Sequence, residues 1–202
     1  MKRYGVRFDR NAVSLFDRSD GTKVRFAVGR YKKAGRPELA DVKISDYCPV
    51  GCSFCYMDST IFGKHGSVEN IEVIAREMGR AKVWEVALGG GETTSHPEFV
   101  RILKIFRDNG VIPNFTTKLP AAVRKFWPEI KGLIGGFAYS AETPAQIRSA
   151  AKLLRDVPSG KASLHYVMGL GDRESFKEYM RAADEVGWRV TLLGYKTSGP
   201  GK

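Results

Sequence analysis

The chain has 202 residues, of which 43% are hydrophobic and 27% charged, and these values are ordinary for one globular domain with its own core. No apolar stretch is long enough to cross a bilayer, which argues against a membrane protein. No apolar segment follows the basic N-terminus, which argues against a secretory signal. We therefore expect a cytoplasmic protein with no membrane partner.

The formal net charge is +11, and it is unevenly distributed. Residues 1–40 carry 11 Lys and Arg against 4 Asp and Glu, a net charge of +7. A basic leader of this kind can contact an anionic partner or substrate, although a solvated basic surface is the commoner case. Both interpretations stay open at this point.

Residues 1–36 are predicted to form a small β-hairpin-like appendage. Tyr4–Phe8 and Val24–Val28 alternate apolar and polar side chains, as half-buried strands do. Ser19-Asp20-Gly21 supplies turn residues between them. The pattern therefore predicts two domains, the appendage and a main domain over residues 37–202.

In the main domain, short strand-like runs alternate with helical runs. Strands are expected to begin near Val42, Val83, Ile112, Phe137, Ala162 and Arg189. Apolar residues at helical spacing predict five helices, in sets that begin at Ile71, Phe99, Val123, Ile147 and Phe176. The last five strands recur every 25 to 29 residues, which is the length of a strand, a helix and two loops. This alternation predicts an α/β fold, a partial, open (β/α)6 barrel with a parallel sheet and outer helices.

Local signatures mark several helix ends. Capping boxes are predicted at three N-termini, Ser95–Glu98, Thr143–Gln146 and Ser175–Glu178. Glycines suited to a left-handed residue after a helix are Gly79, Gly110 and Gly187. Because ligands of parallel sheets bind at the carboxyl ends of the strands, functional residues are expected just after each strand.

The three cysteines of the chain lie close together, at Cys48, Cys52 and Cys55. A disulfide framework needs pairs spread along the chain, so this odd, tight cluster indicates metal ligation or redox chemistry. Three thiolates can bind three irons of a 4Fe-4S cluster and leave the fourth iron open, and an open position is typical of a catalytic metal site. A tetrahedral zinc site completed by His65 is the alternative.

The segment Asp46–Tyr56 resembles the C-x3-C-x-Φ-C motif of the radical SAM superfamily, with Phe54 as the aromatic residue. The loop also follows the first strand of the main domain, as it does in that family. The resemblance covers roughly residues 39–196. It implies that the three cysteines ligate a 4Fe-4S cluster and that S-adenosylmethionine (SAM) chelates the fourth iron. It also implies a reaction, the reductive cleavage of SAM to methionine and a 5′-deoxyadenosyl radical that abstracts hydrogen from a substrate.

The same resemblance implies which residues contact SAM. They are Phe54 near the adenine, Gly90, Gly91 and Glu92 at the methionyl amine, Ser140 and Glu142 at the ribose, and Leu193 at the adenine edge. Thr93 stands where many members of the family have proline. From the residues alone, the glycines could form only a tight turn, and Ser140 and Glu142 could cap the next helix. Asp172 or Glu174 would take an acidic position beside the adenine.

Three further polar residues lie in or after strands, and for each the structural interpretation is preferred. Lys118 and Lys196 each follow a strand and could meet an anionic group, although an ordinary exposed lysine is the commoner case. His165 could face the barrel interior and touch substrate, although a satisfied core residue is the commoner case.

The resemblance also implies partners. A flavodoxin- or ferredoxin-like reductant protein is expected, and the basic leader permits an anionic substrate without identifying it. The chain ends at Lys202, soon after the sixth strand, so we expect a fragment, or a partner chain that completes the barrel. The alternative function is a fragment or subunit that binds SAM and the cluster but needs a partner chain for turnover. A plain electron carrier is disfavoured by the open iron.

Overall fold

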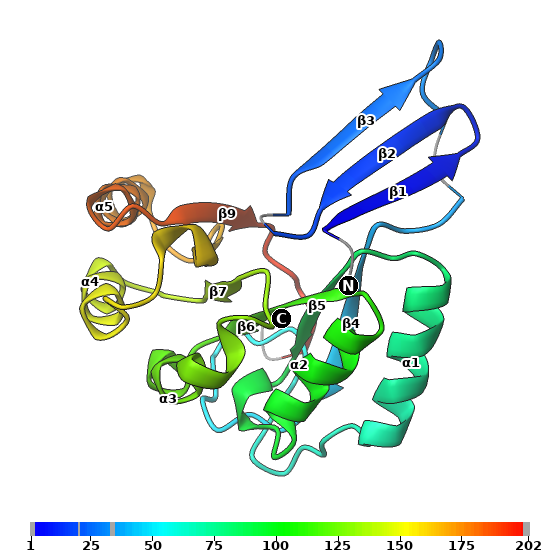
Figure 1. Ribbon diagram of the computed structural model, residues 1–202. Coiled ribbons are helices and arrows are strands. Elements are labelled where there is room, and N and C mark those ends of the chain that lie inside the picture. The colour runs from blue at the N-terminus through cyan, green and yellow to red at the C-terminus, as the bar shows by residue number, and fades with distance from the viewer. Residues whose placement is uncertain (1–2, 20, 33–34, 200–202) are drawn as a thin grey trace.

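The computed structural model describes residues 3–19, 21–32 and 35–199, and its main body is a curved parallel sheet with helices on its outer face (Figure 1). The strands pair in chain order and are β4 (Leu39–Ser45), β5 (Glu85–Gly90), β6 (Ile112–Thr117), β7 (Phe137–Tyr139), β8 (Ala162–Val167) and β9 (Arg189–Leu193). Every pairing is parallel. The predicted partial, open (β/α)6 barrel is confirmed, with β4 and β9 as its edges.

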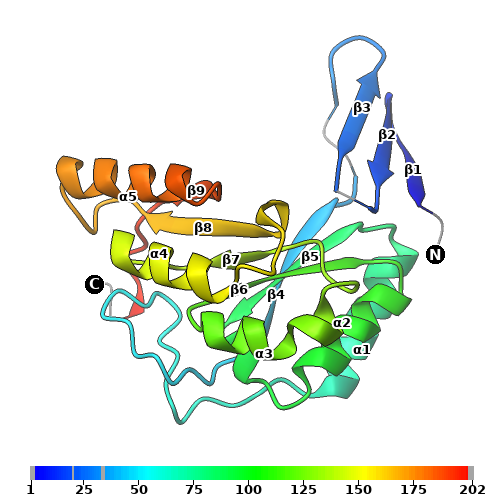
Figure 2. The same cartoon turned by 60° about the vertical axis from the view of Figure 1, so that its left-hand side comes forward.

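Five α-helices follow the first five of these strands and cover the outer face of the sheet (Figures 1 and 2). They are α1 (Val68–Arg80), α2 (Phe99–Asp108), α3 (Pro120–Ile130), α4 (Pro144–Leu153) and α5 (Arg173–Glu185). Two 3-10 helices, η1 (Thr93–Ser95) and η2 (Ser159–Lys161), lie in the connections. All five predicted helices are confirmed. Each packs its apolar face on the outer face of the sheet, which is why the apolar spacing in the sequence marks them.

The core lies between these helices and the sheet. Val86 and Leu88 of β5, Phe115 of β6 and Leu164 of β8 are buried in it. The residues that alternate with them along the same strands are only half-buried, because successive side chains of a strand point to opposite faces. The concave face of the sheet is therefore not part of this apolar core.

The N-terminal capping predictions are right for one helix of three. The capping box at Thr143 is confirmed, since its hydroxyl accepts from the Gln146 N–H while the Gln146 side chain accepts from Thr143. The other two boxes are wrong. Helix α2 begins after Glu98 without a side-chain cap, and α5 is capped by Asp172, whose carboxylate accepts a hydrogen bond from the Ser175 N–H at 2.8 Å.

The glycine predictions are right for two helices of three. Gly110 and Gly187 have the expected left-handed φ angles, 80° and 67°. Gly79 instead lies inside α1, where a Cβ would come within 2.3 Å of the Asn109 carbonyl oxygen. Its missing side chain lets α1 approach the end of α2, a tertiary reason that local sequence does not reveal.

The N-terminal segment is a three-stranded antiparallel sheet, where a hairpin was predicted. The predicted strands correspond to β1 (Tyr4–Asp9) and β3 (Lys23–Ala27), and β2 (Ala12–Asp17) lies between them. The prediction missed β2 because the turn before it has no glycine signal. Arg10 takes the left-handed conformation there, with φ 48°.

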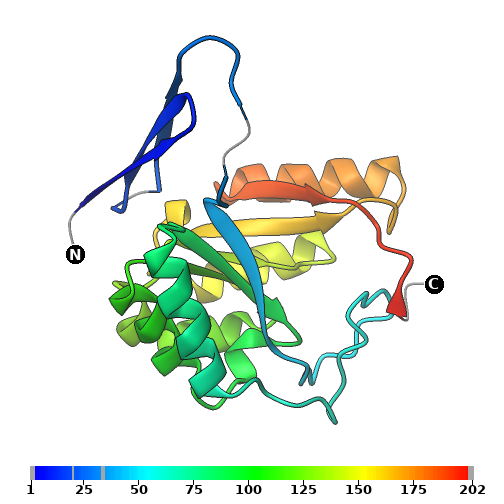
Figure 3. The ribbon, with the colours of Figure 1, turned by 90° about the vertical axis from the view of Figure 1, so that its right-hand side faces the viewer.

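The N-terminal sheet lies at the amino end of the parallel strands (Figure 3) and packs on them through Phe16. Phe16 is fully buried, stacks on Trp84 with ring centroids 5.2 Å apart, and shares a small cluster with Ile112. On the opposite face Phe26 is 61% exposed. The predicted domain boundary between residues 36 and 37 stays a prediction. A substitution of Phe16 tests whether the two parts fold independently. In the part of the chain that is described, no helix is long and apolar enough to cross a membrane.

We expect Phe16→Ala to lower the free energy of unfolding of the whole chain by about 3–5 kcal/mol, because it removes a buried ring shared by both sheets. Urea unfolding followed by far-UV circular dichroism measures this. Phe26→Ala is the matched control and should change stability by less than about 0.5 kcal/mol. If Phe16→Ala leaves the main transition unchanged, the N-terminal sheet folds independently of the main body.

Candidate functional site

The three cysteines lie on the long connection between β4 and α1, at the carboxyl edge of the sheet (Figure 2). All three are free and half-buried. The Cys48 N–H donates to the Thr60 carbonyl oxygen at 2.9 Å, and the Cys55 N–H donates to that of Cys52 at 3.2 Å. These bonds fold the connection into a compact loop, called the cysteine loop below (residues 46–67).

Two histidines, His65 and His96, contact each other where the cysteine loop meets the sheet. The Nδ1 atom of His65 lies 3.0 Å from the Ser45 hydroxyl, and its ring meets that of His96 edge-on at 4.9 Å. Burial, and then the neighbouring His96, lower the pKa of His65. Within residues 3–19, 21–32 and 35–199, no group of three or more His, Cys, Asp or Glu side chains is placed to hold one metal ion. The zinc alternative with His65 as a ligand therefore has no support here.

The turn after β5 is bonded directly to the base of the cysteine loop. The Gly91 N–H donates to the Ser45 carbonyl oxygen at 2.7 Å, and the Glu92 N–H donates to that of Tyr47 at 2.9 Å. A Cβ on Gly91 would lie 2.1 Å from the Tyr47 oxygen, and one on Gly90 would lie 2.1 Å from the Ser45 oxygen. Glycine is thus required at both positions by contact with the loop backbone. Their contact with SAM stays a prediction.

The Glu92 carboxylate is buried, with 3% exposure, and is surrounded by donors from the chain itself. It accepts hydrogen bonds from the Thr94 N–H at 3.1 Å and hydroxyl at 2.6 Å, from the Thr117 hydroxyl at 2.7 Å, and from the Lys118 N–H at 2.8 Å. Three of these bonds fall on Oε1 and one on Oε2, so these donors crowd one oxygen and leave an acceptor position of the other unused. Glu92 therefore fixes the end of β6, from which Lys118 projects.

Lys118 is a residue for which the sequence left two interpretations, a contact with an anionic group and, as the preferred one, an ordinary exposed lysine. Its side chain is only 16% exposed and forms an ion pair with Glu142, and its ammonium lies 5.0 Å from the centroid of the Phe54 ring. Its positive charge also acts on the Cys52 thiol, whose pKa it lowers. The interpretation of Lys118 as an ordinary exposed lysine is therefore wrong, because it joins three predicted site residues that come from two different loops.

Charge at this junction is balanced by Lys118. Burial raises the pKa of the Cys52 thiol, and Lys118 opposes this effect. Burial likewise disfavours the charge of Lys118, but Glu142 and Cys52 together outweigh it, so the pKa of the ammonium is raised. The pKa of the Cys52 thiol stays raised, because burial outweighs Lys118. The cation therefore lessens, without cancelling, the cost of forming the thiolate, which is the form that binds metals.

The other predicted SAM residues lie along the same edge of the sheet. The Ser140 N–H donates to the Thr117 carbonyl oxygen at 3.0 Å. The carbonyl oxygen of Leu193 accepts from the Met168 N–H at 2.8 Å. Two suggested acidic residues are engaged elsewhere, since Asp172 caps α5 and Glu174 pairs with Lys177 at 2.7 Å.

The segment after β9 returns to the cysteine loop (Figure 3). The Lys196 ammonium lies 3.9 Å from the centroid of the Tyr56 ring, and the Ser198 hydroxyl donates to the Tyr56 carbonyl oxygen at 3.3 Å. A Cβ on Gly199 would lie 2.5 Å from the Cys55 carbonyl oxygen. Lys196 is thus also more than an isolated surface lysine, and no local sequence pattern signals such a distant contact.

The donor set of the cysteine loop fits a 4Fe-4S cluster with one open iron. Three free thiols come from one loop that is anchored to the sheet, and the charge of Lys118 acts on one of them, Cys52. A cubane takes one thiolate per iron, so it does not need three donors gathered around a single ion. Iron–sulfur clusters are held by thiolates of this kind.

A parallel (β/α)6 sheet with a three-cysteine loop after its first strand defines a class of metal- and SAM-dependent enzymes. The family model described as "Radical SAM superfamily" matches residues 42–195, and the chain belongs to this superfamily. A search of curated protein sequences finds no match for this chain.

Three solved structures resemble the chain. SuiB of Streptococcus suis bound to S-adenosylmethionine has a TM-score of 0.70 and 12% identity, covering 97% of this chain and 63% of SuiB. SuiB bound to its precursor peptide SuiA has a TM-score of 0.72 and 13% identity, covering 96% and 62%. TYW1 with a lysine–pyruvate adduct has a TM-score of 0.50 and 16% identity, covering 74% and 62%. The likeness shows the fold, and the chain spans less than two thirds of these proteins.

We expect Glu92→Gln to lower the free energy of unfolding by about 1–3 kcal/mol, because the new amide group would face hydrogen-bond donors in a buried site. Thermal or urea unfolding of the chain before cluster loading measures this. Glu98→Gln is the matched control, since Glu98 is exposed and makes one long ion pair at 3.4 Å. Equal effects of the two substitutions would contradict the role assigned to the Glu92 network.

Proposed function

We propose that this chain binds a 4Fe-4S cluster through Cys48, Cys52 and Cys55 and is a SAM-cleaving radical enzyme. The observation that carries the proposal is the anchored three-cysteine loop at the carboxyl edge of a radical SAM sheet. The binding of S-adenosylmethionine by SuiB, which shares this fold, supports SAM as the second ligand. When bound, the cluster supplies the electron that splits SAM into methionine and a 5′-deoxyadenosyl radical, which abstracts hydrogen from a substrate.

The chain's own residues would orient SAM at this edge. Phe54 presents an aromatic face for the adenine, and Ser140 and Glu142 present acceptors for the ribose hydroxyls. Backbone at Gly90 and Gly91, and the carbonyl edge at Leu193, complete the predicted contacts.

Glu92 and Lys118 would act differently from each other at this edge. The Glu92 carboxylate is already bonded to the chain, so we assign it a positioning role through Lys118. The Lys118 ammonium, which contacts Cys52, Phe54 and Glu142, would pair with the carboxylate of SAM.

The partners are also proposals. A flavodoxin- or ferredoxin-like protein would reduce the cluster, and a cytoplasmic location would keep the thiols reduced. The substrate is not identified, and the peptide complex of SuiB makes a peptide one candidate. A partner chain or further segment would complete the barrel beside β9, whose Arg189 and Leu192 are exposed. This exposed edge is also what favours the second candidate function, a SAM- and cluster-binding subunit that turns over only with its partner.

The direct test is anaerobic reconstitution with iron and sulfide, followed by dithionite and SAM. We expect four irons per chain and formation of 5′-deoxyadenosine, because reduction of the cluster releases the radical even without substrate. Cys48→Ala, Cys52→Ala and Cys55→Ala should each reduce the product at least about a hundredfold, since each removes one of three ligands. An intact cluster that yields no 5′-deoxyadenosine alone, but does so with a partner chain, would favour the subunit; none under either condition would defeat the enzyme.

We expect Lys118→Met to raise the Kd for SAM at least about tenfold while the chain retains iron, because one charge-assisted hydrogen bond contributes about 1.5–3 kcal/mol. Equilibrium dialysis with labelled SAM measures the Kd. Lys64→Met is the control, since Lys64 is an exposed lysine on the same loop. An unchanged Kd in the Lys118 variant would remove this residue from the SAM site.

A further inference from the structure

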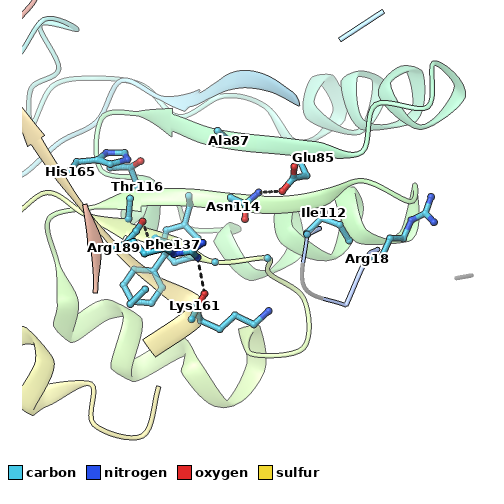
Figure 4. Close-up of a pocket in the computed structure, with 18 of the residues that line it drawn as sticks. Arg18, Glu85, Ala87, Ile112, Asn114, Thr116, Phe137, Lys161, His165 and Arg189 are labelled. Atoms are coloured by element: carbon cyan, nitrogen blue, oxygen red, sulfur yellow. Dashed lines mark hydrogen bonds between the residues drawn. The ribbon is translucent and has the colours of Figure 1, made fainter. Parts of the chain in front are cut away.

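The concave face of the sheet is lined by small and polar side chains. Those that point into it are Ala87 of β5, Asn114 and Thr116 of β6, Ala138 of β7, and Ser163 and His165 of β8. The apolar residues that alternate with them face the helices. His165 lines this open face (Figure 4), so of its two interpretations the barrel-interior position holds and the preferred core position does not. Such a lining leaves room for a polar molecule.

The amino half of this face holds a cavity of about 350 Å³. The connection between β2 and β3 closes it on one side through Arg18, while Lys161 at the end of η2 and Arg189 at the start of β9 line it on another (Figure 4). This volume is within the range of small-molecule sites, about 300–1,000 Å³. The cavity is separate from the cysteine loop, which lies at the carboxyl edge.

The described residues that line the cavity carry more positive than negative charge. The one carboxylate among them is Glu85, which forms an ion pair with Lys23 at 2.5 Å. Lys161 donates to the Ile134 carbonyl oxygen at 3.0 Å, and Arg189 donates to that of Gly160 at 3.1 Å. Among the described residues, neither Lys161 nor Arg189 has a carboxylate partner, and each retains donors that these single bonds do not use.

Two more cations lie around the same end of the sheet. Burial, and then the neighbouring Arg107, lower the pKa of Lys161. Burial, and then Arg18, likewise lower the pKa of Arg107. Cations that repel one another in a half-buried site are stabilised when an anion binds between them.

We propose that this cavity binds the phosphate group of a small phosphorylated molecule, with Lys161 and Arg189 as its principal ligands. Arginine forks and lysine ammonium groups are the side chains that bind phosphate oxygens most strongly. A ligand with a single carboxylate carries one negative charge, which is too little to balance these cations.

The cavity lies close enough to the carboxyl edge of the sheet for one bound molecule to reach both. Strand β9 begins at Arg189, in the phosphate site, and ends at Leu193, at the carboxyl edge. At about 3.3 Å per residue, about 13 Å separates the two. A phosphate ester about the size of a nucleotide spans this distance. The identification of this molecule as the substrate rests on the proposed function, whereas its binding does not.

The test uses inorganic pyrophosphate as the probe and the full chain before cluster loading, because pyrophosphate would also chelate iron. Isothermal titration calorimetry at about 0.15 M ionic strength limits the contribution of exposed charges. Lys161→Met and Arg189→Met should each weaken binding at least about tenfold, and Arg189→Lys should lose less than Arg189→Met. Lys104→Met, which removes an exposed lysine from the outer side of α2, should leave the Kd unchanged. Circular dichroism verifies that each variant is folded.

Three results would overturn the proposal. The first is no saturable pyrophosphate binding by the wild-type chain, and the second is equal loss of binding in the Lys104 variant. The third is binding of an oligothymidylate, but not of pyrophosphate, that depends on Lys161 and Arg189, which would assign the cations to nucleic acid. The 5′-deoxyadenosine assay is read separately, so pyrophosphate binding without SAM cleavage would defeat the proposed function and leave the phosphate site standing.

Discussion

The close approach of two backbone segments, residues 45–47 and 90–92, fixes the geometry of the whole site. The peptide groups of Gly91 and Glu92 donate to the carbonyl oxygens of Ser45 and Tyr47 at 2.7 and 2.9 Å. There is no space at Gly90 or Gly91 for a Cβ, since each would lie 2.1 Å from a carbonyl oxygen. The start of the cysteine loop is thereby held against the end of β5, so the thiols are attached to the sheet and not only to a surface loop.

This contact continues through side chains to the predicted SAM residues. The Glu92 side chain extends from this backbone contact to the end of β6. There its carboxylate accepts hydrogen bonds from the Thr117 hydroxyl and the Lys118 N–H. The Lys118 side chain then reaches back to Cys52 and across to Glu142. A buried carboxylate that accepts four hydrogen bonds from its own chain is held rigidly. The positions of the site residues are therefore fixed by hydrogen bonds of the backbone and of the Glu92 carboxylate. These bonds are present within the chain before any ligand binds.

The sequence predicted most of the fold because the fold repeats. Apolar residues at helical spacing, as at Phe99 and Ile147, mark helices that bury one face of the sheet, and all five were found. Local rules failed where a distant segment decides the conformation. Gly79 is a glycine because of Asn109, and β2 follows a turn in which Arg10 takes a left-handed conformation without a glycine.

The site was predictable to the extent that its residues are contiguous in sequence. The three cysteines and the glycine turn could be identified from spacing and resemblance. Lys118 could not, because its role depends on an ion pair 24 residues away in the chain and on the carboxylate of Glu92. The cavity at the other edge escaped notice for the same reason, since Lys161 and Arg189 line one cavity only after the strands pair.

A comparison of Gly91→Ala with Gly89→Ala tests the central claim most directly. A Cβ on Gly89 meets no atom within 4 Å, whereas one on Gly91 would collide with the loop backbone. After anaerobic reconstitution, iron and sulfide content and SAM-dependent change in the electron paramagnetic resonance signal are measured for both. The account predicts that the Gly89 variant retains the wild-type cluster and signal and that the Gly91 variant loses them. Full iron content and an unaltered SAM response in the Gly91 variant would contradict it.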